Sequence, residues 1–166
     1  MKTVSLIFTI GLLLLFSGCT NKNESHFQEI LNNTRKDALG HFNSNNWLRM
    51  DSISVIEFIS LLPVQEHLSN KMHILTTIGQ VKADWINEQD LEILMEYIDS
   101  ENPSHCVVQA ISSQSPIGEE STVGGQIINI INSYRRKEPY PNFLTLCAET
   151  NEARIEEVKK WWKNRD

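Results

Sequence analysis

Histidines, cysteines and clustered carboxylates are the side chains whose types and spacing could support chemistry in this sequence. The histidines show no metal-ligand pattern, because no two stand four residues apart and none belongs to an H-E-x-x-H motif. They are His26, His41, His67, His73 and His105. His105 precedes Cys106, but adjacent residues on a helix point about 100° apart, which does not place a base beside a nucleophile. The sequence predicts no catalytic residue, no metal site and no cofactor.

Carboxylates gather in the stretch from residue 88 to residue 99, beside an apolar stripe with helical spacing. A general acid would need one of these carboxylates in a desolvated pocket, and the pattern instead predicts an exposed helix face. We expect this face to contribute to binding of a macromolecular partner. Its candidate residues are Glu88, Glu92, Glu96 and Asp99.

Tyr140 and Phe143 lie in the proline-rich segment Glu138-Pro-Tyr-Pro-Asn-Phe143. They could present a rigid aromatic surface to a protein or a sugar, which makes them candidate binding residues. They could equally cover the edge of the core.

Cys106 and Cys147 remain after Cys19 is set aside. An oxidising compartment would allow them to pair in a disulfide. Free cysteine is also among the most buried residue types, so two unpaired core cysteines fit the sequence as well.

The first nineteen residues have the pattern of an export signal. Lys2 provides a basic start, Val4 to Phe16 form an apolar run, and Ser17-Gly18-Cys19 places small residues before a cysteine. The run is shorter than the roughly 20 residues of a membrane-spanning helix. The segment resembles the bacterial lipobox, although Phe16 stands where Leu, Val or Ile is usual. The resemblance implies cleavage before Cys19 and lipidation of that cysteine; the alternative is an ordinary secretory signal with a chance cysteine.

Charge restricts the partners of the mature chain. The formal charge is −6, and removal of residues 1–18 deletes Lys2 and no acid, which leaves −7. This charge argues against nucleic acid and favours a basic protein partner. We expect a signal peptide over 1–18, a lipidated tether over 19–25 and one folded domain over 26–166.

Apolar spacing predicts helices through most of that domain. The first covers 27–42, and a second runs from Asp51 or Ser52 to Leu62, where β-branched residues leave a strand open. A third follows through 67–78, and Asn87 caps a fourth with Asp90 at its third position.

The last two predicted helices begin near Ser121 and at Thr150 or Asn151. The first of these is apolar on nearly all sides, which indicates a central position. Gly124 and Gly125 at its start predict close approach of another backbone. An anion site at this helix start is disfavoured, because Glu119 and Glu120 would repel phosphate.

A helix–turn–helix pattern spans residues 87–113. It consists of Leu91-x-x-Leu94-Met95-x-x-Ile98-Asp99, then Pro103, then Val107-Val108-x-Ala110-Ile111. The pattern resembles a HEAT repeat, which implies stacked helix pairs. A generic helical hairpin explains the same residues.

We therefore expect an all-α, HEAT-like bundle attached through Cys19 to a bacterial membrane in the cell envelope, with its body periplasmic or surface-exposed. We expect a non-catalytic binding protein, most specifically an immunity protein that neutralises a toxic enzyme. The alternative is a small envelope hydrolase or accessory protein acting on cell wall or glycan.

Overall fold

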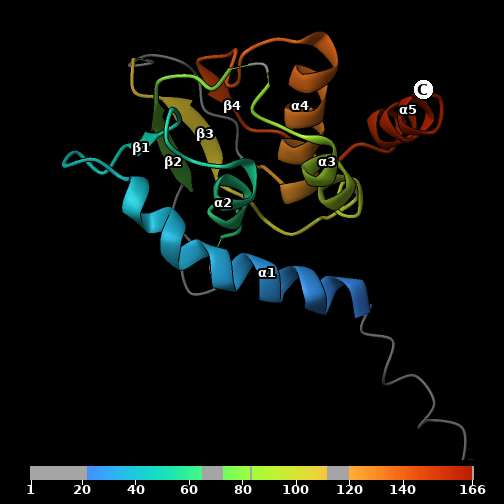
Figure 1. Ribbon diagram of the computed structural model, residues 1–166, viewed down its shortest axis with the longest axis horizontal. Coiled ribbons are helices and arrows are strands. Elements are labelled where there is room, and N and C mark those ends of the chain that lie inside the picture. The colour runs from blue at the N-terminus through green and yellow to red at the C-terminus, as the bar shows by residue number, and fades with distance from the viewer. Residues whose placement is uncertain (1–21, 65–72, 83, 112–119, 166) are drawn as a thin grey trace, which may run out of the picture.

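The computed structural model describes residues 22–64, 73–82, 84–111 and 120–165 (Figure 1). Within these ranges the α-helices are α1 (Lys22–Ala38), α2 (Val55–Ser60), α3 (Glu88–Met95), α4 (Val123–Arg136) and α5 (Glu152–Lys163), with a 3₁₀ helix η1 (Leu39–His41). The strands are β1 (Leu48–Arg49), β2 (Ile74–Ile78), β3 (Cys106–Gln109) and β4 (Thr145–Leu146). The fold class is α/β, so the prediction of an all-α fold is wrong.

The four strands form one mixed sheet in the order β1-β2-β3-β4. β1, β2 and β3 are parallel, with Leu48 opposite Thr77 and Leu75 opposite Val107. β4 is antiparallel to β3, with Val107 opposite Leu146. Parallel neighbours need a crossover rather than a tight turn, and α2 and α3 lie in the two crossover connections.

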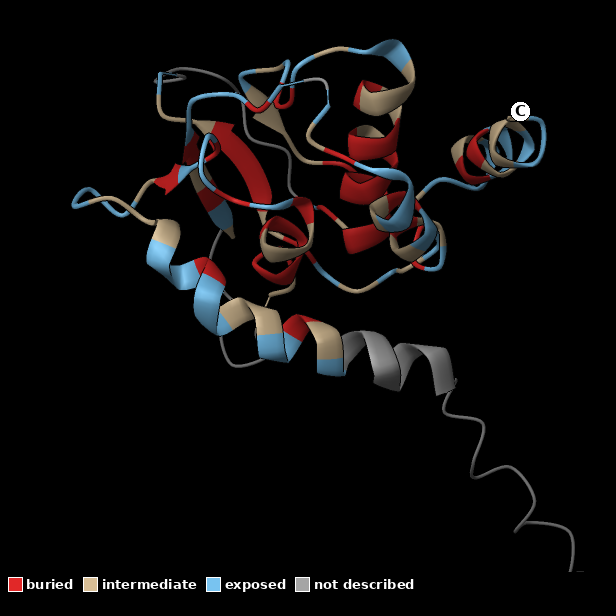
Figure 2. Cartoon of the chain, in the orientation of Figure 1, coloured by how far each residue is buried: buried red, intermediate tan, exposed pale blue. Residues whose placement is uncertain are grey.

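The two faces of this sheet differ in burial. Figure 2 colours each residue by its burial, and most of β3 is buried. Leu48, Leu75 and Val107 share the buried face, because residues that alternate along a strand point to the same side. Ile74 and Ile78 point to the opposite face and are 37% and 39% exposed. The main core therefore lies on one side of the sheet.

β2 replaces the later part of the helix predicted through 67–78. Burial alternates along Ile74–Ile78, with Leu75 and Thr77 buried between more exposed neighbours. Leu75 and Ile78 also have the three-residue spacing of a helix, and a run this short fits both periods. The β-branched isoleucines and threonines favour the strand. Residues 67–72 of that predicted helix lie outside the described residues.

β3 contradicts the HEAT-like helix pair. Val107 and Val108, predicted on its second helix, lie in β3 between β2 and β4. Ser104, just before β3, is buried, and its N–H donates to the carbonyl of Ser121 at 2.8 Å. Because consecutive β-branched residues favour a buried strand, this pair does not extend a helix. The HEAT-like hairpin prediction is wrong.

Helices with clear start signals were predicted more accurately. Asn87 caps α3 as expected, and the Asp90 side chain completes a reciprocal capping box; Asn151 caps α5. α2 begins later than expected, since its N-cap is Ser54, which forms a capping box with Glu57. No helix in the described ranges has the length and apolar content that a membrane span requires.

α4 is the central helix, as predicted, and its two glycines explain how closely it packs. A Cβ at Gly124 would lie 2.6 Å from the carbonyl oxygen of Ile98, and one at Gly125 would overlap the carbonyl oxygen of Ala148. Side-chain atoms therefore have no room at either position. The predicted close approach of another backbone is confirmed.

Gly125→Ala should lower the free energy of unfolding by about 1–3 kcal/mol, because the new methyl group must displace the backbone at Ala148. An unconstrained helical Gly→Ala change would instead stabilise by about 0.5–1 kcal/mol. Gly40→Ala in η1 is the matched control, because a Cβ there meets nothing within 4 Å. Urea denaturation measures both variants, and a Gly125→Ala protein as stable as the wild type would contradict the packing argument.

Candidate functional site

The negative charge of the protein is concentrated in the segment 84–101. This segment contains seven acidic residues and no lysine or arginine, whereas acids and bases balance over the rest of residues 19–166. The acids are Asp84, Glu88, Asp90, Glu92, Glu96, Asp99 and Glu101. The segment alone therefore accounts for the charge of −7 that remains when residues 1–18 are removed.

α3 holds the middle of this segment with one side buried. The Asn87 side chain accepts from the Asp90 N–H at 2.9 Å, and the Asp90 carboxylate accepts from the Asn87 N–H at 3.0 Å. Leu91 and Leu94 are fully buried against the rest of the core. Glu92 is consequently directed to solvent, as are Glu96 and Asp99 just beyond the last helical residue.

The predicted acids are not equivalent. Glu88 accepts from the Tyr134 hydroxyl at 3.0 Å and from the Arg165 guanidinium, whose carbon lies 3.1 Å from the ring centre of Trp162. The hydrogen bond to Glu88 raises the pKa of Tyr134 above its usual value. Glu88 thus connects the start of α3 to α4 and to the end of the chain, and is not free for a partner.

Glu92 and Asp99 are exposed and have no hydrogen bond or ion pair within the described ranges. Glu96 is also exposed, and its carboxylate adds to the effect of burial in raising the pKa of Tyr97. We name Glu92, Glu96 and Asp99 the acidic surface. Their charges are exposed to solvent and available to an approaching cation.

The aromatic candidates lie in the core. Tyr140 is 1% exposed; its ring stacks on Trp85 at 5.8 Å and meets the edges of Phe58 and Phe143 at 5.5 and 5.6 Å. Burial raises the pKa of the Tyr140 hydroxyl, which has no hydrogen-bond partner among the described residues. Tyr140 is therefore part of the core and not an exposed binding residue, and half-buried Phe143 packs against it.

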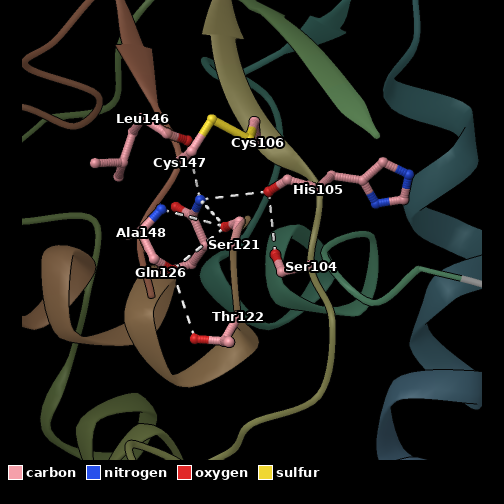
Figure 3. Close-up of a disulfide and its surroundings, with 9 residues drawn as sticks. All are labelled: Ser104, His105, Cys106, Ser121, Thr122, Gln126, Leu146, Cys147 and Ala148. Atoms are coloured by element: carbon pink, nitrogen blue, oxygen red, sulfur yellow. Dashed lines mark hydrogen bonds between the residues drawn. A yellow bond between two sulfur atoms is a disulfide. The ribbon is translucent and has the colours of Figure 1, made fainter. Parts of the chain in front are cut away.

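Cys106 and Cys147 form a disulfide between β3 and the residue after β4 (Figure 3). The buried Gln126 amide lies beside it and donates to the Ser121 hydroxyl at 2.9 Å and to the Leu146 carbonyl at 3.1 Å. The His105 ring points away from the disulfide, and its Nδ1 lies 2.8 Å from the carbonyl oxygen of Leu62. Cys106 is therefore part of a structural crosslink, and the adjacent His105 ring is directed away from its sulfur.

His41 belongs to a cluster of polar side chains that the sequence patterns did not indicate. His41 Nδ1 lies 3.0 Å from the Ser52 hydroxyl, and Nε2 lies 3.3 Å from a Glu57 oxygen. A hydroxyl, an imidazole and a carboxylate in this order resemble the components of nucleophilic catalysis. Glu57, however, accepts from both the N–H and the hydroxyl of Ser54, at 2.8 and 2.6 Å.

The cluster is best explained as a set of structural hydrogen bonds that join η1 to the start of α2. Burial raises the pKa of Glu57, but the hydrogen bonds from Ser54 and His41 outweigh it and hold the pKa below its usual value. Ser52 also donates to the Arg49 carbonyl at 3.3 Å, which ties its hydroxyl to the turn. The motif Ser54-x-x-Glu57 is the sequence signal that could have located this cap.

Cys19, the predicted lipidation site, lies outside the described residues. Across the described part of the chain, no three His, Cys, Asp or Glu side chains gather closely enough to hold a metal ion. Among the sites predicted from the sequence, the acidic surface remains as a candidate binding site.

His105 should make stability depend on pH below about 6.5, the value for an unfolded histidine. Burial lowers the pKa of His105 in the fold, the bond to Leu62 partly opposes this, and the nearby His73 and Arg35 lower it further. The unfolded chain therefore takes up the proton first, and the free energy of unfolding falls as the pH decreases through this range. His105→Gln should flatten that fall in urea titrations between about pH 7 and pH 5. An unchanged slope would show that His105 does not contribute.

Comparison with known proteins gives this site no relatives. No protein-family model matches the chain, and neither a curated protein nor a solved structure matches it.

Proposed function

We propose that this protein is a lipid-anchored cell-envelope protein that binds a basic macromolecular partner through its acidic surface. Within that class, the specific proposal is an immunity protein that neutralises a toxic enzyme. The observation that carries the proposal is the segregation of charge, since one segment carries seven acids without a single base. Such a field steers an oppositely charged partner and speeds its association.

The packing of α3 supports a rigid binding surface. The capping box fixes the start of the helix, and the Glu88–Arg165 ion pair and the Tyr134 hydrogen bond hold it against α4 and the C-terminal residues. Because the backbone that carries these acids is fixed, only their side chains lose conformational entropy when a partner binds. The acidic surface is thus preorganised rather than part of a loose tail.

The proposed anchor would hold this body close to a membrane. α1 begins at Lys22, three residues after Cys19 and within the segment expected to be a tether. Three extended residues span at most about 10 Å. A lipid on Cys19 would therefore keep the start of α1 near the headgroups, and the protein would meet its partner in the envelope.

Charge reversal tests the binding surface. Glu92→Lys with Glu96→Lys should slow association with a partner captured from native envelope extract by about tenfold or more at low salt. The difference should shrink at high salt, because screening shortens the range of the field. Stopped-flow association at two ionic strengths measures both effects.

Glu29→Lys with Asp37→Lys is the matched control, because both acids are exposed on α1 and the change in net charge is identical. Equal effects from the two double variants would show that only net charge matters. If Glu92→Lys with Glu96→Lys had no effect on association, the proposed binding surface would be wrong. Turnover of peptidoglycan or another glycan by the purified wild type would favour the hydrolase alternative.

Lipidation is tested separately. Mass spectrometry of the membrane fraction should show an acylated peptide that begins at Cys19, and Cys19→Ala should abolish the modification and release the protein from the membrane. An unmodified mature chain in the soluble fraction of wild-type cells would contradict the anchor.

A further inference from the structure

The structure contains a polar hollow that the acidic surface does not use. It has a volume of about 180 Å³ and lies over α4, α5 and the loop that follows α4. Its lining is almost wholly polar, which excludes an apolar ligand. We define the hollow by six of its lining residues. They are Asn129, Asn132, Arg136, Glu138, Asn142 and Arg154.

Charge within the hollow is balanced. Among the lining residues, Arg136 and Arg154 supply two positive charges, and Glu138 and Glu157 supply two negative charges. Glu157 also pairs with Arg135, outside the lining, at 3.0 Å. A site for phosphate or another anion would show an excess of arginine or lysine, and a polyamine site would show an excess of carboxylate. Neither excess is present, so the lining fits a neutral polar ligand.

Several lining side chains are already held in place by hydrogen bonds within the chain. The Asn129 amide donates to the Gly125 carbonyl at 2.8 Å and accepts from Arg154 at 3.0 Å. Asn132 accepts from Arg135 at 2.8 Å, and Asn142 donates to Glu138 at 2.6 Å. Side chains fixed in this way lose little entropy when a ligand binds.

These internal bonds leave both donors and acceptors unused. The Asn132 amide nitrogen still has its protons, and Arg136 makes no hydrogen bond or ion pair within the described residues. The carbonyl oxygen of Asn142 and the second oxygen of Glu138 still accept. A hydroxyl group both donates and accepts, whereas a phosphate mainly accepts and an ammonium only donates.

We infer that this hollow binds a saccharide residue, a neutral ligand that carries several neighbouring hydroxyl groups. Its volume is below the 300–1,000 Å³ typical of sites for larger ligands, so it suits one sugar unit. The hollow is lined by residues of α4, α5 and the loop after α4, whereas the acidic surface lies on α3 and the turn that follows it. Sugar recognition is thus a second binding function, independent of the proposed protein partner.

The inference is tested with the mature chain and three defined sugars, N-acetylglucosamine, mannose and galactose. Ligand-observed NMR should detect at least one of them with a Kd in the millimolar range, as expected for a small ligand with few contacts. Asn132→Ala with Asn142→Ala should weaken that sugar at least tenfold. Arg136→Gln, at an exposed position without an internal partner, should also weaken it and provides a variant with little risk to folding.

Asn32→Ala with Asn33→Ala is the matched control, since it removes two exposed asparagines from α1 and should leave the Kd unchanged. Glycine and inorganic phosphate are the competing probes. Sugar binding unaffected by both site variants would overturn the inference, as would binding of glycine or phosphate alone, or no sugar binding up to about 20 mM. Co-sedimentation with insoluble peptidoglycan, with and without the soluble sugar as competitor, distinguishes a cell-wall glycan from a free saccharide.

Discussion

The close contact of the first turn of α4 with two other backbone segments is the constraint on which the rest of the structure depends. Gly124 donates its N–H to the Ser100 carbonyl at 3.0 Å, and the Thr122 N–H donates to the Ala148 carbonyl at 2.9 Å. The turn after α3 and the segment after β4 are therefore both fixed to the start of one helix. The Thr150 hydroxyl completes the junction, because it reaches both Thr122 and the Ser100 carbonyl. Any side chain larger than hydrogen at the glycines would separate these three elements.

The disulfide and Gln126 reinforce this junction from the sheet side. Cys106 and Cys147 are 41 residues apart in sequence. In the chain-entropy model, closing a loop of this length raises the free energy of the unfolded chain by about 4 kcal/mol. Gln126 donates to the last residue of β4 from within α4, so the same helix holds the edge of the sheet. β4 has only two residues, so its own ladder pairs it with β3 at only two positions. Crosslink and amide together keep this short strand in place.

Prediction succeeded where one local signal determined an element and failed where packing decided. Asn87 and Asp90 mark the start of a helix, and the glycine pair in α4 marks a close backbone contact. Both signals are local in sequence, and both were interpreted correctly. Ile74–Ile78 and Val107-Val108 are too short for periodicity to separate helix from strand, and only their pairing with each other identifies them as a sheet. The exposure of Glu92, Glu96 and Asp99 was predictable from the spacing of acids and apolar residues. The burial of Tyr140 and the polar hollow were not, because each depends on segments distant in sequence.

α4 also explains how one small domain could carry the two proposed binding surfaces. The helix is buried along most of its length, with Ile127, Ile128, Ile130 and Ile131 fully covered, so it is a fixed reference for its neighbours. Tyr134 links it to the start of α3 through Glu88, which sets the orientation of the acidic surface. Asn129 links it to α5 through Arg154, which shapes the polar hollow. Because the two surfaces use different polar residues of one rigid helix, occupation of one need not distort the other.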